Sequence, residues 1–318
     1  MDFKNVTLAG AGVLGSQIAF QIAYSGFDVS VWVRSDASAE RAQAKFDRLK
    51  NIYLDRIDQM AAGEGRWSNG IADQGASKDE LLALKDKVEA AHSGLKIYTD
   101  MAEAVKDADL VIEAVAENPE QKIEFYTQLA PLLKEDAILA SNSSTLLPST
   151  FAKYTGRPEK FLMFHFANEI YTNNTAEVMG HDGTSQEAFD AMVEFAKAIR
   201  MVPLEVLKEQ PGYILNTMLS PFLSSAMYLW SNDIAHPHTV DKTWELATGA
   251  PKGPFKIIDI VGLTTVRNIA GLHPDAKTEG SIQNVMVKKL TEMLDAGKSG
   301  IIAGEGFYKY VDGKAVEE

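Results

Sequence analysis

The chain has 318 residues, which is long enough for two domains. Hydrophobic residues make up 46% and charged residues 24%, a composition typical of globular proteins. Its formal net charge of −13 argues against nucleic acid as a partner, although a few local donors can still hold one phosphorylated small molecule. The absence of cysteine excludes disulfides, thiolate nucleophiles and cysteine-bound metals.

The first residues, MDFKNVTLAGAGVLG, lack the basic region, apolar run and cleavage site of a signal peptide. No apolar stretch of the sequence is long enough to span a bilayer. We therefore expect a cytoplasmic protein with no membrane partner.

Strands alternate with helices from the start of the chain. Residues 6–9 and 29–33 are short apolar or β-branched runs, and residues 16–24 between them have a helical pattern. This alternation predicts a parallel sheet with crossover helices. The later strand candidates are residues 110–115, 137–140 and 161–166, and the later helix candidates are residues 101–106, 122–133 and 189–196.

A charged, helix-prone stretch at residues 37–91 interrupts this alternation. The glycine-rich segment 63–75 divides it, which predicts an exposed helical hairpin. The expected fold class is therefore α/β, a doubly wound parallel sheet with a protruding helical hairpin, over a first domain of residues 1–202.

Helical periodicity dominates the rest of the chain, which predicts a smaller all-α domain over residues 203–318. The segment 214–230 is apolar on nearly every side and must be buried somewhere. A subunit interface would bury it in a homodimer, and a position inside the domain would explain the pattern as well.

A glycine turn joins the first strand to the first helix and matches the pattern G-x-G-x-x-G. In this pattern the first glycine permits the turn, the second lets the backbone approach a pyrophosphate, and the third lets helix and strand pack closely. Its position after a strand and before a helix predicts a Rossmann-type dinucleotide site, with the diphosphate at the helix N-terminus. The expected cofactor-binding residues of the turn are Gly10, Gly12, Val13, Leu14 and Gly15.

The end of the second strand leaves the choice of nicotinamide open. A carboxylate expected there would bind the ribose hydroxyls of NAD. The sequence instead has Arg34 and Ser35, which could hold the 2′-phosphate of NADP, while Asp36 could still reach the ribose. We expect NAD, with NADP as the alternative.

His165 lies inside an apolar strand, and Glu177 lies in the next strand candidate, where it could orient the imidazole. The pair could provide acid–base catalysis, whereas a lone histidine in such a strand is more often a hydrogen-bonded core residue. No histidine clusters with acidic residues at ligand spacing, so we expect no metal site.

Several longer motifs accompany these residues in a fixed order, and in that order they resemble the L-3-hydroxyacyl-CoA dehydrogenase family, including its 3-hydroxybutyryl-CoA dehydrogenases. The likeness runs nearly end to end. The motifs are KNVTLAGAGVLGSQIA, VIEAVAENPEQK, SNSST, HF followed by AEVM, PGYILN, GAPKGPFKIIDIVGL and GEGFYKY.

The resemblance implies an oxidoreductase of fatty acid metabolism that moves a hydride between a nicotinamide and C3 of a 3-hydroxyacyl-CoA. His165 would exchange the hydroxyl proton, held by Glu177 as in a catalytic triad. Ser144 and Asn216 would donate hydrogen bonds to the substrate oxygens. The resemblance also places three further residues at the cofactor, namely Glu117, Lys122 and Asn142.

Two segments depart from the family. An aromatic residue and a proline usually stand where this chain has Ala167 and Glu169, in a loop that lies beside the substrate in the family. The segment 63–75 also looks lengthened, in a hairpin that helps to hold coenzyme A in the family. Two alternatives to a 3-hydroxyacyl-CoA dehydrogenase stay open. One is a dehydrogenase of a free 3-hydroxy acid, such as carnitine or a sugar acid, and the other is a cofactor-binding scaffold without activity.

Overall fold

A computed structural model describes residues 3–311 and 314–316. The chain divides into two compact units, Met1–Ile214 and Leu215–Glu318. The domain boundary predicted between residues 202 and 203 falls inside β8 (Val202–Val206), a strand of the first unit. Pro203 fits in this strand because β8 is an edge strand, and one side of an edge strand needs no ladder hydrogen bond.

The first unit is built around one sheet, which has eight strands within the described residues. The strand order is β3-β2-β1-β4-β5-β6-β7-β8, and every neighbouring pair is parallel except β6 with β7. This order is the doubly wound arrangement predicted from the sequence, with its reversal between β1 and β4. The remaining strands are β1 (Asn5–Ala9), β2 (Asp28–Trp32), β3 (Lys96–Tyr98), β4 (Leu110–Glu113), β5 (Ile138–Ser141), β6 (Phe161–Phe166) and β7 (Thr175–Met179).

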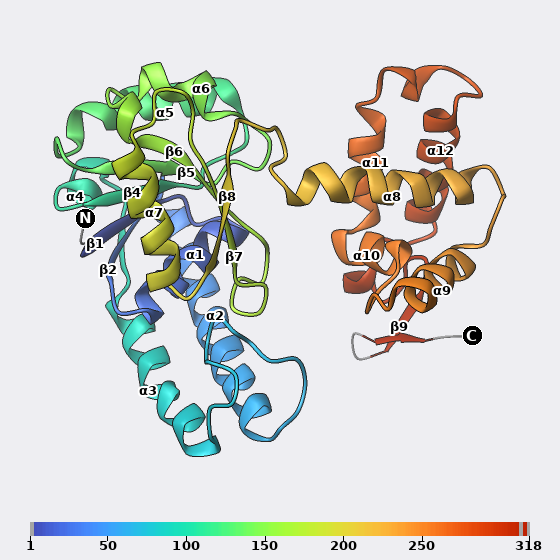
Figure 1. Ribbon diagram of the computed structural model, residues 1–318, viewed down its shortest axis with the longest axis horizontal. Coiled ribbons are helices and arrows are strands. Elements are labelled where there is room, and N and C mark those ends of the chain that lie inside the picture. The colour runs from blue at the N-terminus through green and yellow to red at the C-terminus, as the bar shows by residue number, and fades with distance from the viewer. Residues whose placement is uncertain (1–2, 312–313, 317–318) are drawn as a thin grey trace. The chain divides into compact units, whose positions relative to one another are not determined.

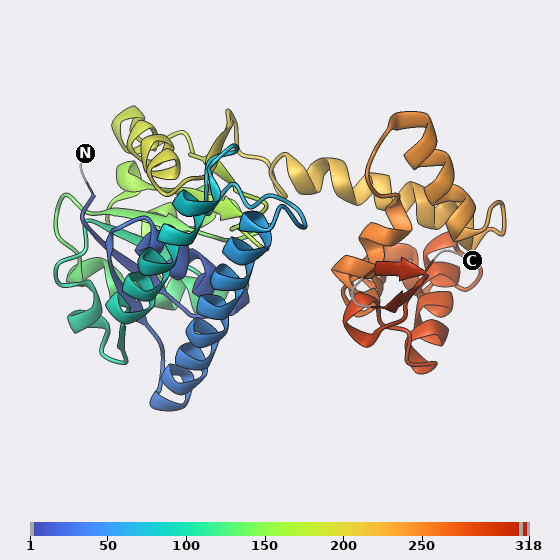
Figure 2. The same cartoon turned by 90° about the horizontal axis from the view of Figure 1, so that it is seen from below.

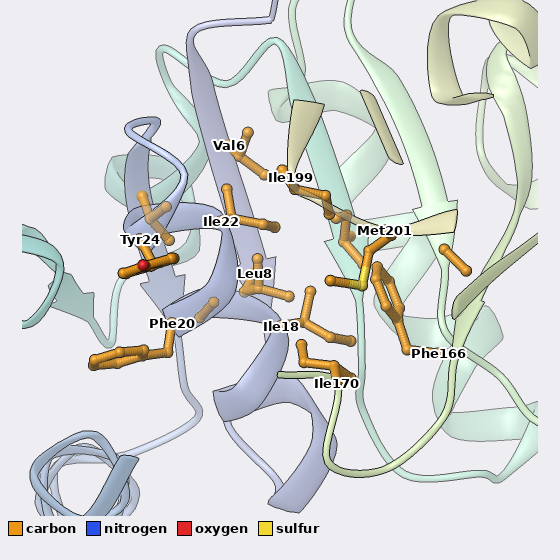
Figure 3. Close-up of a cluster of buried hydrophobic side chains, with 14 of the residues drawn as sticks. Val6, Leu8, Ile18, Phe20, Ile22, Tyr24, Phe166, Ile170, Ile199 and Met201 are labelled. Atoms are coloured by element: carbon orange, nitrogen blue, oxygen red, sulfur yellow. The ribbon is translucent and has the colours of Figure 1, made fainter. Parts of the chain in front are cut away.

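Helices cover both faces of this sheet, and each face has its own hydrophobic core. Side chains of β1 alternate between the two cores, because successive residues of a strand point to opposite faces. Figure 3 shows Val6 and Leu8 of β1 packed with Ile18 and Ile22 of the first helix in one of these cores. The helices of the unit are α1 (Val13–Tyr24), α2 (Asp36–Ala61), α3 (Lys78–Gly94), α4 (Met101–Val105), α5 (Pro119–Leu129), α6 (Pro148–Phe151) and α7 (Gln186–Ala198), with short 3-10 turns at Ala130–Leu132, Ala152–Tyr154 and Pro158–Lys160.

Helices α2 and α3 form the predicted hairpin and extend side by side beyond the sheet (Figure 1). The segment between them is not exposed throughout, because residues 68–72 in its middle are largely buried. The hydroxyl of Ser68 lies 3.0 Å from that of Thr172, and the amide of Gly70 donates to the carbonyl of Tyr171 at 3.0 Å. The segment therefore folds back onto the loop that follows β6.

The second unit is helical, as predicted, around a core that includes Phe255, Ile258 and Leu290. It also contains a two-stranded hairpin of β9 (Lys309–Val311) and β10 (Lys314–Val316), visible as the red arrows in Figure 2, so it is not purely α-helical. Within the described part of the chain, no helix combines the length and the apolar character needed to cross a bilayer. The helices are α8 (Leu215–Ser231), α9 (Pro237–Thr248), α10 (Pro254–Val261), α11 (Leu263–Gly271) and α12 (Ile282–Asp295), with short 3-10 turns at Pro274–Lys277 and Ile301–Ala303.

Candidate active site

The glycine turn lies at the carboxyl end of β1, beside the strand-order reversal where doubly wound sheets bind their ligands. Gly10 has φ of +108°, and a Cβ there would lie 2.6 Å from the carbonyl oxygen of Ala114. A Cβ on Gly15 would collide with the carbonyl oxygen of Gly10, so this glycine lets α1 pack closely on the turn. The space above Gly12 is open, because a Cβ at this residue would meet nothing within 4 Å.

This arrangement fits a bound diphosphate. Gly12 is the N-cap of α1 and provides no side-chain hydrogen bond to the first turn of the helix. The N–H groups at the start of α1, at Val13 and Leu14, are therefore available to an anion, and the helix dipole favours negative charge there. The first and third glycines have packing roles that other residues cannot fill, and the second leaves room for a ligand.

A pocket of about 590 Å³, called the cofactor pocket below, opens beside the turn. Its lining joins the glycine turn to the end of β2, to one face of α2 and to the β4–α5 segment. Arg34 is exposed and lines this pocket, whereas Ser35 and Asp36 are exposed and do not. Ser35 caps α2 instead, and its hydroxyl accepts the amide hydrogen of Ser38.

His165 and Glu177 face each other across the antiparallel pair β6 and β7. Nδ1 of His165 lies 2.9 Å from Oε2 of Glu177, and both residues are buried, at 6% and 4% exposure. A carboxylate only accepts hydrogen bonds, so the contact fits the tautomer with its hydrogen on Nδ1, in which Nε2 can accept a proton. The two residues predicted as a pair are therefore in contact, and the pair has the geometry of an oriented general base.

The segment after β8 returns over this pair. The ring of Tyr213 stacks on the imidazole of His165, with 4.6 Å between ring centroids and 14° between planes. The hydroxyl of Tyr213 donates to the carbonyl of Ser143 at 2.6 Å, and the amide of Ile214 donates to Oε1 of Glu177 at 2.9 Å. Both oxygens of Glu177 are thus engaged, which fixes the carboxylate and, through it, the imidazole.

The SNSST loop follows β5 and is held by Glu117. Oε1 of Glu117 accepts the hydroxyl of Ser143 at 2.6 Å and the amides of Ser144 and Thr145, each at 3.0 Å. Burial raises the pKa of Glu117, but the hydrogen bond from Ser143 and the ammonium of Lys122 outweigh burial and lower it overall. An ionised Glu117 therefore fixes the loop that carries Ser144, which is half-buried.

Asn142, at the start of the same loop, connects two strand ends. Its side-chain oxygen accepts the amide hydrogen of Phe166 at 3.1 Å, which joins the end of β5 to the end of β6 just beyond His165. The contact positions the loop relative to the imidazole.

Lys122 is placed differently from what the resemblance implies. Its side chain is 1% exposed, and its ammonium donates to Oε1 of the fully buried Glu113 at 2.6 Å. The hydroxyls of Tyr126 and Ser141 donate to the other oxygen of Glu113 at 2.6 and 2.7 Å. The ammonium also lies 3.5 Å from Oε2 of Glu117. A side chain this buried contacts the carboxylates of Glu113 and Glu117 and does not line the cofactor pocket.

Family models match almost the whole chain. The NAD binding domain of 3-hydroxyacyl-CoA dehydrogenase matches residues 5–210, and the C-terminal domain of the same enzyme matches residues 212–310. The chain belongs to the 3-hydroxyacyl-CoA dehydrogenase family. It is therefore a dehydrogenase by family, with a nicotinamide cofactor.

Individual members of the 3-hydroxyacyl-CoA dehydrogenase family align over most of their length. The human mitochondrial hydroxyacyl-coenzyme A dehydrogenase is 30% identical, over 96% of this chain and 91% of the human protein. The 3-hydroxybutyryl-CoA dehydrogenase of Clostridioides difficile is also 30% identical, over 96% and 99%. A solved diketoreductase structure has 44% identity and a TM-score of 0.85, covering 98% of this chain and all of that one.

The loop after His165 contains a residue with a left-handed backbone conformation. Glu169 has φ of +58°, and its amide donates to the side-chain oxygen of Gln17 at 2.9 Å. Proline, the usual family residue, has φ near −65° and no N–H, so it can adopt neither feature. A proline at position 169 would therefore need a different backbone from the one that Glu169 adopts.

Asn216, the remaining catalytic candidate of the family pattern, lies in α8 of the second unit and is half-buried. Tyr213 and Glu113 were missed by the sequence reasoning. Tyr213 lies inside the PGYILN motif, directly after a glycine. Its backbone has a positive φ of 56°, which is visible only in the structure. Glu113 stands inside VIEAVAENPEQK, where a carboxylate in an otherwise apolar strand was the available signal.

Proposed function

We propose that this dehydrogenase transfers a hydride between a nicotinamide dinucleotide and C3 of a 3-hydroxyacyl compound, with His165 as the acid–base residue. The observation that carries the proposal is the buried contact of 2.9 Å between Nδ1 of His165 and Glu177. A bound nicotinamide supplies the hydride acceptor in oxidation and the donor in reduction.

In the oxidative direction, Nε2 of His165 takes the proton of the 3-hydroxyl while the C3–H bond breaks. Glu177 keeps Nδ1 protonated and stabilises the imidazolium that forms, and the stack with Tyr213 holds the ring plane. In reduction the same nitrogen returns the proton to the new alkoxide. Ser144 donates a hydrogen bond to a substrate oxygen, which stabilises charge at the carbonyl.

The leading substrate class is a coenzyme A thioester, in keeping with the family and with the relatives from human and Clostridioides difficile. A second class, a free dicarbonyl or hydroxy compound, is favoured by two observations. The diketoreductase at 44% identity is described as acting on dicarbonyl compounds, and the loop at Glu169 departs from the usual family pattern.

One pair of substrates separates these classes. Acetoacetyl-CoA and ethyl acetoacetate carry the same reacting 3-oxo group. The reduction of each compound is monitored by the loss of nicotinamide absorbance, once with NADH and once with NADPH. For a thioester enzyme we expect kcat/KM to be higher for acetoacetyl-CoA by about a hundredfold, equivalent to roughly 2.8 kcal/mol from the coenzyme A part. If kcat/KM for ethyl acetoacetate equals or exceeds that for acetoacetyl-CoA, the substrate belongs to the free dicarbonyl class. No absorbance change with any 3-oxo compound would contradict the proposed activity and favour an inactive scaffold.

We further propose a homodimer formed through α8. Leu215, Met218 and Tyr228 of this helix lie outside the hydrophobic core of the second unit. Burying such side chains in a two-fold interface would explain a helix that is apolar on nearly every side. Light scattering should then give twice the chain mass of 34.8 kDa, and a mass of one chain would contradict it.

A further inference from the structure

One wall of the cofactor pocket is basic. Ser38, Arg41 and Lys45 of α2 all line it, and their spacing of three and four residues places them on one face of the helix. The ammonium of Lys45 donates to the carbonyl of Ala11 in the glycine turn at 2.6 Å, which fixes this face of α2 against the turn. A guanidinium nitrogen of Arg41 donates to the hydroxyl of Ser38 at 2.7 Å.

Arg34 adds a second guanidinium, from the position just after β2. Among the described residues, no carboxylate pairs with Arg34 and no hydrogen bond occupies its side chain. Two arginines and the hydroxyl of Ser38 thus line the part of the pocket formed by the end of β2 and the start of α2.

The carboxylate that would bind the ribose hydroxyls of NAD is missing from this place. In the usual arrangement it stands at the end of the second strand, where this chain has Val33 and Arg34. Asp36, the first acidic residue after β2, is exposed and lies outside the pocket lining. Glu124 is acidic and does line the pocket, but it comes from α5, which follows β4 on the other side of β1 from β2.

We propose that the cofactor pocket selects a nicotinamide dinucleotide that carries a 2′-phosphate, with Arg34 and Arg41 binding the phosphate and the hydroxyl of Ser38 donating to it. This inference rests on the proposed function, because it concerns the cofactor of the same site. A phosphate monoester carries about −1.5 to −2 charges at neutral pH and presents three acceptor oxygens, which suit two guanidinium groups. An unphosphorylated ribose gives these cations no anionic partner.

Binding to the full-length protein, measured by isothermal titration calorimetry, tests the inference without turnover. The ligands are NADP⁺ and NAD⁺, together with 2′,5′-ADP and 5′-AMP, which contain no nicotinamide. We expect NADP⁺ and 2′,5′-ADP to bind at least about tenfold more tightly than their partners that lack the 2′-phosphate, because hydrogen bonds to charged groups are the strong ones. This preference should weaken as the salt concentration rises.

Variants of exposed residues locate the phosphate. Arg34→Ser should weaken NADP⁺ binding at least about tenfold and change NAD⁺ binding by less than about twofold. Arg34→Asp should reverse the preference, since it places a carboxylate at the end of β2. Arg48→Ser removes the same charge from an exposed position of α2 outside the pocket lining and should change neither affinity.

The outcomes separate this inference from the proposed function. If NAD⁺ binds as tightly as NADP⁺ or more tightly and supports turnover, the 2′-phosphate site is contradicted and the proposed hydride transfer stands. If none of the four ligands binds, both are contradicted. If Arg34→Ser and Arg48→Ser weaken NADP⁺ binding equally, the assignment of the phosphate to Arg34 is contradicted.

Discussion

Tyr213 contacts both parts of the proposed catalytic site, stacking on His165 and donating its hydroxyl to the carbonyl of Ser143. Burial first, and then the nearby carboxylates of Glu117 and Glu177, raise the pKa of Tyr213 far above its ordinary value of 10.0. The hydroxyl therefore stays protonated and remains a donor throughout the range in which enzymes are assayed. Tyr213 is a positioning residue in this account, because it acts on the imidazole rather than on substrate.

Two substitutions separate the ring of Tyr213 from its hydroxyl. Tyr213→Phe keeps the stack and loses one hydrogen bond, so it should lower the free energy of unfolding by about 0.5–1.5 kcal/mol and leave kcat nearly unchanged. Tyr213→Ala removes a buried ring, so it should lower the free energy of unfolding by about 3–5 kcal/mol and reduce kcat with little change in nucleotide affinity. Denaturant titration and steady-state kinetics measure these effects.

Tyr24→Phe is the matched control for the hydroxyl. Tyr24 is also buried, and its hydroxyl donates to the carbonyl of Ile71 at 3.0 Å within the hydrophobic core. Its loss should affect unfolding to a similar extent and leave kcat unchanged. Equal kcat in Tyr213→Ala and wild-type protein would contradict the positioning role.

The sequence could identify residues whose neighbours are set by local pattern. His165 and Glu177 stand in two successive strand candidates, and the antiparallel register of β6 and β7 brings them opposite each other. Tyr213 and Glu113 were missed because their contacts depend on how the folded chain buries them, and Lys122 was predicted to lie at the cofactor without its burial being foreseen. Hydrophobic periodicity does not predict that residues 213–214 return over β7. It also does not predict that Lys122 is buried beside the carboxylate of Glu113.

Among the elements, the junction of β4 and α5 depends on a buried ion pair. Glu113 ends β4, Lys122 lies in α5, and neither side chain is more than 1% exposed. Removing one partner of such a pair leaves the other charge buried without compensation, which is strongly destabilising. The pair therefore joins the strand to the helix and supports Glu117 between them.

Lys122→Met should lower the free energy of unfolding by about 3–5 kcal/mol, because it leaves the buried carboxylate of Glu113 without a cationic partner. The double variant Glu113→Gln, Lys122→Met removes both charges and should recover part of this loss. Urea titrations of the two single variants and the double variant form the cycle. Additive losses across the cycle would show that the two residues do not stabilise each other.

Long apolar or strongly periodic elements could be predicted, and short or polar ones could not. The run of residues 161–166 predicted β6 with its observed bounds, because all six side chains are buried. The three-residue strand β3 begins with an exposed lysine and was missed. The burial of residues 68–72 was missed too, since the glycine-rich composition that suggests a loop also permits the close contact between Gly70 and Tyr171.

At the scale of the whole molecule, the overall plan of a doubly wound sheet followed by a helical unit was confirmed, because it follows from patterns that extend over many elements. The position of the division between the units was harder to read. The change to helical periodicity suggested a division after residue 202, whereas β8 pairs with β7 and the first unit continues to Ile214.

Acid stability of the molecule should depend in part on Glu117. Its pKa in the folded protein lies below the ordinary value of 4.5, so its ionisation favours folding above the unfolded pKa. That contribution is lost as the pH falls below 4.5 and through the folded pKa. The difference in the free energy of unfolding between wild type and Glu117→Gln should therefore be largest above pH 4.5 and shrink on acidification. A difference that stays constant with pH would contradict this origin.

Proton transfer by His165 is the central step of the proposed function, and His165→Gln tests it most directly. Turnover of the better acetoacetyl substrate and binding of the nicotinamide dinucleotide are measured on the same preparation. We expect kcat to fall by about 10²–10⁴-fold while the dissociation constant of the dinucleotide changes by less than about twofold. A variant that keeps near-normal turnover with an unchanged pH profile would contradict it.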